Sequence, residues 1–151
     1  MGTDLKPEQI HLLAPLAVLV LWTLVMMIWM TIARSRGMAQ AGVTPDQLPA
    51  GMQGDFYQAR IRPEYMWPGQ NYNHLFEQPT IFYAIAIALI LIGPWAWDVR
   101  LAWIYVGLRI LHSIWQSFVN TIYVRFTLFF LSSVTLALMA AHVLHFALRY
   151  G

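Results

Sequence analysis

Polar side chains recur at helical spacing inside an otherwise apolar run, residues 101–118 and just beyond. The members of this group are Tyr105, Arg109, His112, Gln116 and Asn120. At about 100° per residue they fall on one side of a helix. A charge in hydrocarbon costs roughly 2.5 to 3.5 kcal/mol on insertion scales and persists where it faces protein or a water-filled cavity. These residues are therefore the first candidates for a functional site.

Two further polar groups accompany this one. Gln70, His74 and Glu77 recur at i, i+4 and i+7, so on a continuous helix they share a face. Arg125 begins a similar stack farther along the chain, in which Phe129 and Ser132 follow it. If the three helices pack together, these faces converge on one cavity.

Two interpretations of the charged residues remain open. Glu77 can form a buried ion pair with Arg109 or Arg125 that sets the helix register. Alternatively the arginines form an anion site, because a guanidinium binds carboxylates bidentately. A second arginine can lower the pKa of a bound thiol from its usual value of about 8.5. Arg125, which has no obvious acidic neighbour, is the candidate for this second role.

Other kinds of chemistry find little support in the sequence. The chain has no cysteine, so it supplies neither disulfides nor thiolate ligands. The pairs His74/Glu77 and His142/His145 each place two ligands one turn apart, but the second matching motif of a dimetal bundle is missing. We predict no metal. The serines lack an evident base, and no basic run indicates nucleic acid as a partner.

Composition indicates the elements that must position these residues. Of 151 residues, 59% are hydrophobic and 11% are charged, against about 25% charged in an ordinary soluble domain. Four segments are near or above the ~20 residues needed to cross a bilayer, namely 12–33, 73–97, 101–120 and 124–148. The prediction is an all-α integral membrane protein, a four-helix bundle in one domain, 1–151.

Charge distribution predicts how this bundle is oriented. Residues 34–72 are rich in glycine and proline and are expected to form a long irregular loop, either a partly ordered connection or a lid over a site. Because arginines concentrate in the first and third connections, both should be cytoplasmic, with the termini on the opposite side. These arginines are Arg34, Arg36, Arg60, Arg62 and Arg125. Trp95, Trp97 and Trp103 surround the short second connection and are expected to anchor it among the lipid headgroups.

Several short motifs together resemble a known family. They are Asn71-Tyr72-Asn73-His74-Leu75-Phe76-Glu77-Gln78-Pro79, Phe82-Tyr83, Leu108-Arg109-Ile110-Leu111-His112-Ser113, Asn120 and Arg125-Phe126. In this order and spacing they resemble the MAPEG family, the membrane-associated proteins in eicosanoid and glutathione metabolism, in a bacterial branch. The expected location is therefore a bacterial inner membrane.

This resemblance implies a homotrimer that binds glutathione between subunits on the cytoplasmic side. It implies that Arg125 is catalytic and stabilises the glutathione thiolate, which then attacks a hydrophobic electrophile, as in a microsomal-type glutathione transferase or peroxidase. It further implies that residues along the second and third helices line or support the site. The candidate glutathione-binding residues are His74, Glu77, Arg109, His112, Gln116 and Asn120.

The chain also departs from the pattern of the family's enzymes. They have arginine where this chain has Gln70 and asparagine where it has His74. They commonly show tyrosines where it has Gln116 and Phe129. These departures favour the alternative of a non-catalytic membrane protein, which packs lipid or serves a larger complex. A small transporter or proton-relay subunit is a third possibility.

Overall fold

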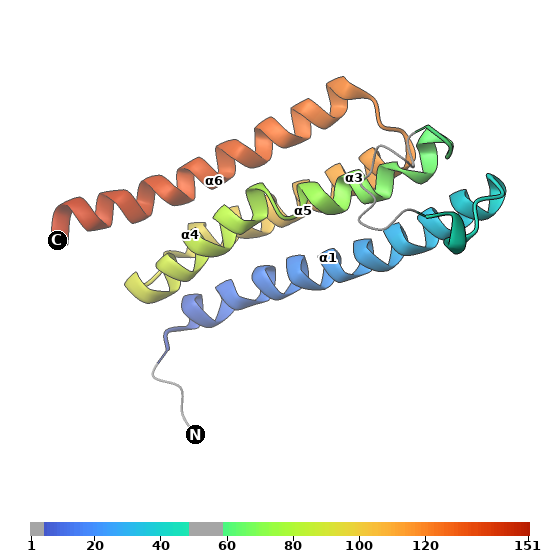
Figure 1. Ribbon diagram of the computed structural model, residues 1–151. Helices are drawn as coiled ribbons and strands as arrows, with labels where there is room; N and C mark the ends of the chain where they lie inside the picture. The colour runs from blue at the N-terminus through green and yellow to red at the C-terminus, as the bar shows by residue number, and fades with distance from the viewer. Residues whose placement is uncertain (1–4, 49–58) are drawn as a thin grey trace.

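The computed structural model describes residues 5–48 and 59–151, and these parts contain helices and no strand. The helical rods of the bundle, α1, α3 followed by α4, α5, and α6, lie side by side (Figure 1). The α4–α5 link and the C-terminus lie at one end of the bundle, and the α5–α6 turn lies at the other. The elements are α1 (Pro7–Gln40), η1 (Pro45–Gln47), η2 (Pro63–Tyr65), α3 (Trp67–His74), α4 (Gln78–Ile92), α5 (Ala96–Phe118) and α6 (Ile122–Tyr150).

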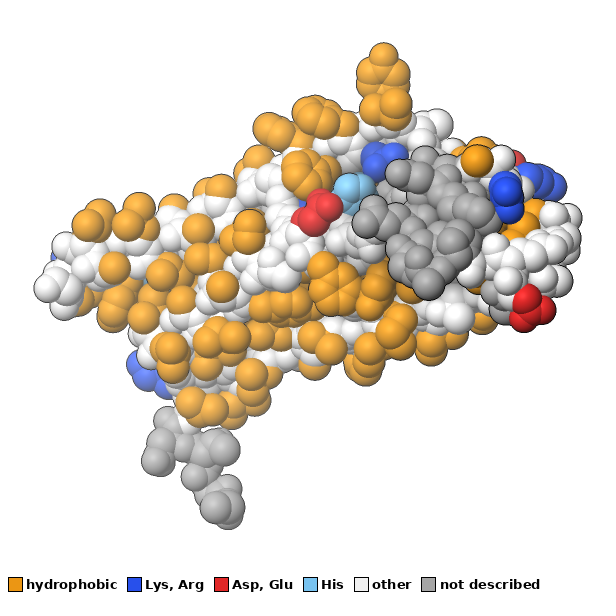
Figure 2. All heavy atoms as spheres, viewed as in Figure 1, with side chains coloured by type: hydrophobic (Ala, Val, Ile, Leu, Met, Phe, Trp, Pro, Cys, Tyr) orange, Lys and Arg blue, Asp and Glu red, His pale blue; other side chains and the backbone are white. Residues whose placement is uncertain are grey.

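The surface of the bundle is apolar along the rods, as the hydrophobic side chains in Figure 2 show. Leu91 and Leu148, for example, are each 80% exposed. Within the described residues, three helical stretches are long and apolar enough to cross a membrane: Pro7–Gln40, Pro63–Ile92 and Ile122–Tyr150. Such a surface is stable against lipid tails rather than water. The chain is thus an all-helical integral membrane protein. α5, which carries the polar group 105–116, is not among the three.

The first connection differs from the predicted loop 34–72. α1 begins at Pro7, with proline in the first turn where its missing N–H is harmless, and continues to Gln40. Arg34 and Arg36 therefore extend a helix, although the sequence placed them in a loop. At the other end of this connection α3 starts at Trp67. Residues 49–58 of the predicted loop lie outside the described residues.

The second predicted span, 73–97, is interrupted. α3 ends at His74 and α4 begins at Gln78. In a continuous helix the ring of Pro79 would clash with the carbonyl of Leu75 and remove a hydrogen bond, so the interruption falls just before this proline. α4 then ends at Ile92, ahead of Gly93, whose φ of 92° suits glycine.

The last two helices begin earlier than the predicted spans 101–120 and 124–148. α5 starts at Ala96 because Asp98 caps it: its carboxylate accepts the Trp95 N–H at 2.7 Å. It ends at Phe118, shortly before Asn120, whose φ is 58°. Asn120 therefore lies in the α5–α6 turn and not on the polar face of α5, where the sequence placed it.

Polar clasps at both ends hold the rods together around an apolar centre. Gln9 of α1 donates to the Ile90 carbonyl of α4 at 2.6 Å. Near the opposite end of α4, Gln78 donates to the Ser133 hydroxyl of α6, also at 2.6 Å. Asp98 of α5 pairs with His142 of α6 at 2.8 Å. Fully buried residues between these ends include Leu12, Leu19, Met26, Phe82, Ala86, Leu89, Tyr105 and Met139.

A prediction concerns Gly37, where α1 packs against the chain segment that leads into α3. A Cβ at Gly37 would lie 2.5 Å from the Ile61 Cγ2 and 2.9 Å from the Tyr65 Cβ. Gly37→Ala should therefore lower the free energy of unfolding by about 1–3 kcal/mol. Thermal denaturation in detergent, followed by circular dichroism, measures the loss.

The matched control is Gly107→Ala, because a Cβ at this helical glycine meets nothing within 4 Å. Alanine stabilises a helix by about 1 kcal/mol relative to glycine, so this variant should melt no lower than the parent. Equal melting temperatures for the two variants would contradict close packing at Gly37.

Candidate functional site

A cavity of about 400 Å³ lies between α5, α6 and the α3–α4 break. Figure 2 shows an acidic, a histidine and a basic side chain next to one another near the middle of the visible face. The cavity combines two arginines, two histidines and a glutamate with an apolar wall. Its lining residues are His74, Glu77, Arg109, His112, Ile122, Arg125, Phe126 and Phe129.

Arg109 is the most deeply buried charge of this cavity, with 2% of its surface exposed. Its guanidinium carbon lies 5.4 Å from the centre of the Tyr105 ring and 5.2 Å from that of Phe129. The two rings stabilise the cation through their faces. Among the described residues, the Nε and Nη2 of Arg109 have no hydrogen-bond partner. Arginine stays charged, so its guanidinium can donate two hydrogen bonds to one anion.

Arg125 reaches the cavity from the first turn of α6 and is held in place by Asn120. Its Nη1 donates to the Asn120 Oδ1 at 2.7 Å. Asn120 adopts the left-handed conformation, which asparagine tolerates better than most residues. The Nε of Arg125 has no hydrogen-bond partner in the described part of the chain. The turn between the two helices thus aims one cation at the cavity.

Glu77 pairs with His74, and the sequence-based expectation that it pairs with an arginine is wrong. Its Oε2 lies 2.8 Å from the His74 Nδ1. No salt bridge joins Glu77 to Arg109 or Arg125 in the ranges 5–48 and 59–151. Glu77 precedes α4, and its carboxylate lies against His74, the last residue of α3. Both arginines therefore lack a carboxylate partner in this part of the chain.

His112 connects this pair to the interior. It is 6% exposed, and its ring meets that of His74 edge to face, with centroids 6.5 Å apart. The order Glu77, His74, His112 therefore runs from the exposed rim to the buried wall. His112 lies one turn from Arg109 on α5, so the cationic and imidazole groups share this wall.

Two candidate residues do not line the cavity. Gln116 is fully buried, and its amide nitrogen and oxygen have no partner among the described residues. Asn120 lies outside the lining and affects the site only by accepting the hydrogen bond of Arg125. The remaining five, His74, Glu77, Arg109, His112 and Arg125, lie together around the cavity.

Sequence reasoning missed most of the apolar wall: it placed Phe129 on the same face as Arg125, but not Ile122 or Phe126. Ile122, Phe126 and Phe129 recur at i, i+4 and i+7 on α6, the spacing that brought the polar residues to attention. Apolar residues in a membrane helix carry no such signal, because most of them face lipid or core. As for metals, the described residues include no group of three potential ligands.

The fold and this cavity define the class: an integral membrane helical protein with a charged pocket at one end of its bundle. The family model of the MAPEG family matches residues 12–145, nearly the whole chain. The chain belongs to the MAPEG family. Comparisons with curated proteins and with solved structures found no match.

A comparison of two acid–histidine pairs tests these assignments. Glu77 and Asp98 each lie 2.8 Å from a histidine, but their side chains are 62% and 0% exposed. Glu77→Ala should cost less than about 1 kcal/mol of stability, as exposed pairs do. Asp98→Ala should lower the free energy of unfolding by about 3–5 kcal/mol, because it leaves the buried His142 without its partner.

Thermal denaturation of both variants in the same detergent gives the two values. A large loss in Glu77→Ala, comparable to that in Asp98→Ala, would mean that Glu77 balances a buried cation after all.

Proposed function

We propose that this protein binds glutathione, or a closely similar small thiol, in the cavity of Arg109 and Arg125 and activates its sulfur. The observation that carries the proposal is the presence of two arginines with unfilled donors around one cavity, while the neighbouring carboxylate is engaged by a histidine. A buried cation without a counter-ion is costly, so such a cavity favours an anionic ligand. Glutathione offers both carboxylates and a thiolate.

The two arginines have different parts in this proposal. Arg109, rigidly held between two rings, suits bidentate binding of a carboxylate. Arg125, held through a single hydrogen bond that it donates to the Asn120 Oδ1, suits the sulfur. A guanidinium next to a thiol lowers its pKa and raises the thiolate fraction at neutral pH. The proton leaves to water.

The reaction that follows is a nucleophilic attack. The thiolate sulfur donates its electron pair to an electrophilic carbon, a C–S bond forms, and the leaving group departs with the electrons of the broken bond. The apolar wall supplies the binding surface for a hydrophobic electrophile. Ile122 and Phe126 are 75% and 67% exposed, so a substrate dissolved in lipid can approach from this side.

The exposed wall also supports assembly with further copies of the chain. A site bounded on one side by exposed Ile122 and Phe126 gains closure if a neighbouring subunit packs there. We extend the proposal to a homotrimer with four membrane-crossing rods per subunit, in which α5 is shielded from lipid. The arginine-rich end would then face the cytoplasm of a bacterial cell, where glutathione is available.

Calorimetry tests ligand binding directly. Glutathione should bind the detergent-purified protein saturably, and Arg125→Ala should weaken affinity about tenfold or more, because hydrogen bonds to charged groups contribute about 1.5–3 kcal/mol. Arg100→Ala removes an exposed cation at the other end of the bundle and should bind like the parent. A well-assembled parent that binds no glutathione would contradict the proposal. The oligomer mass is recorded on the same sample.

Asn120 provides a second test, in which Arg125 itself is unchanged. Asn120→Gly keeps the left-handed backbone but removes the acceptor of Arg125, and Asn120→Asp keeps an acceptor but adds a negative charge. Both should raise the pKa of the bound thiol, Asp more than Gly. Ultraviolet absorbance of the thiolate across a pH series measures this. A pKa that stays at the parent's value in both variants would separate Arg125 from sulfur activation.

A non-catalytic role is the second candidate, and one observation favours it. None of the eight lining residues carries a hydroxyl group that could hold the peptide or its sulfur. The protein would then bind an anionic ligand or a partner without turnover. Glutathione-dependent consumption of chlorodinitrobenzene by the parent, lost in Arg125→Ala protein that still assembles, would exclude this candidate.

A further inference from the structure

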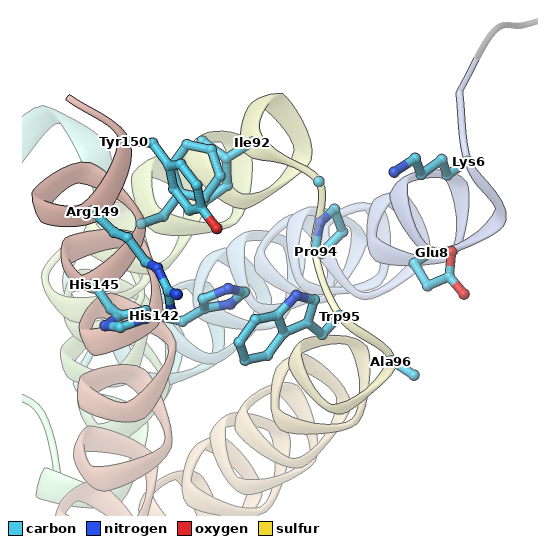
Figure 3. Close-up of a pocket in the computed structure, with 12 residues that line it drawn as sticks. Lys6, Glu8, Ile92, Pro94, Trp95, Ala96, His142, His145, Arg149 and Tyr150 are labelled. Carbon is cyan, nitrogen blue, oxygen red and sulfur yellow. The ribbon is translucent and has the colours of Figure 1, made fainter.

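A second cavity, of about 530 Å³, lies at the opposite end of the bundle. It is formed where the start of α1, the α4–α5 link and the end of α6 meet (Figure 3). Arg125 and His142 are 17 residues apart on α6, or about 25 Å at 1.5 Å per residue. The two cavities therefore belong to opposite faces of the membrane, and the proposed thiol site uses none of the residues of the second one.

His142 lines this cavity, and its imidazole is held in place by Asp98. Its Nδ1 lies 2.8 Å from the Asp98 Oδ2, and the side chains are only 4% and 0% exposed. Asp98 is fixed in turn by the Trp95 N–H at 2.7 Å. A carboxylate accepts hydrogen bonds, so the Nδ1 carries the hydrogen and the Nε2 is left for a ligand. The Trp95 ring, with its centroid 4.0 Å away, covers the imidazole.

Basic residues surround the open side of this imidazole. Figure 3 shows His142 between the Trp95 ring and the side chains of His145 and Arg149. Lys6 adds another cation at the mouth, and Glu8 is the single acid among the lining residues. The lining thus offers several donors and an excess of positive charge.

Aromatic rings place this cavity at a particular depth. Trp95 and Tyr150 line it, and both are more than half exposed. Amphipathic rings of this kind concentrate at the level of the lipid headgroups. Arginine and lysine bind phosphate, the first through a planar fork and the second as a point charge.

We propose that this second cavity binds a phosphate group, with the Arg149 guanidinium as its principal donor and the His142 ring beside it. The phosphate can belong to an anionic phospholipid headgroup or be free in solution, and both sources share this chemistry. Asp98 is a positioning residue that holds the imidazole. The ligand would tie α6 to the α4–α5 link at the end of the bundle remote from the thiol site.

The experiment titrates the purified full-length protein in neutral detergent with two probes, short-chain phosphatidylglycerol and inorganic phosphate. Calorimetry gives the affinity. The key variant is Arg149→Gln, an exposed substitution that leaves the core intact. It should weaken binding of the effective probe about tenfold. The matched control is Arg100→Gln, an exposed arginine at the same end outside the cavity lining, which should bind like the parent.

Histidine NMR separates a defined site from general attraction to a cationic surface. Resonances of His142 should shift on addition of the effective probe, while those of His11, exposed on α1, stay in place. Binding of phosphatidylglycerol alone assigns the site to lipid, and binding of both probes assigns it to the phosphate anion itself. Failure of both probes to bind, equal losses in the two arginine variants, or an unmoved His142 would overturn the proposal.

Discussion

Polar groups at membrane depth must be satisfied by other protein groups, because lipid tails offer none. This constraint organises the bundle around α5. α5 carries Asp98, Arg109, His112 and Gln116, all of which are buried, and the other rods cover them. α6 supplies His142 for Asp98 and the Phe129 ring for Arg109. Because α5 is the rod least suited to face lipid, it is central to the packing.

The distribution of these polar groups along α5 produces two different ends. Around Asp98 one carboxylate oxygen, Oδ2, joins the Trp95 backbone N–H and the His142 imidazole in one network, while Oδ1 has no partner among the described residues. Around Arg109, two donor atoms of a buried guanidinium lack partners in the same part of the chain. The first arrangement stabilises the bundle. The second leaves donor atoms of Arg109 without a partner in the described part of the protein, and we therefore assign the proposed thiol chemistry to that end.

The helix break before Pro79 borders the charged cavity. Pro79 follows the interruption of the second rod, at which Glu77 lines the cavity with its carboxylate paired to His74 and mostly exposed. Among the described residues neither Arg109 nor Arg125 has a salt bridge, so the cavity favours an anion.

Much of the fold followed from the sequence alone. Long apolar stretches predicted a helical membrane protein, and residue types at helical spacing predicted which faces carry charge. The motifs also indicated the MAPEG family, which the family match over residues 12–145 confirms. These properties depend on composition and on the 3.6-residue period, both of which are local. Helix ends were less accurate, because they depend on which of several possible local contacts forms, such as that of Asp98 with the Trp95 N–H or that of Asn120 with Arg125.

Only the tertiary structure decided which charges meet. Sequence spacing treated Glu77 as the partner of an arginine and left His142 as half of a weak metal motif. In the folded chain Glu77 bonds His74, Arg125 bonds Asn120, and His142 bonds Asp98, 44 residues away. Periodicity specifies the face of a helix on which a side chain lies. It does not specify the rotation and axial position of one rod against another, and these set every distance between charges on different rods.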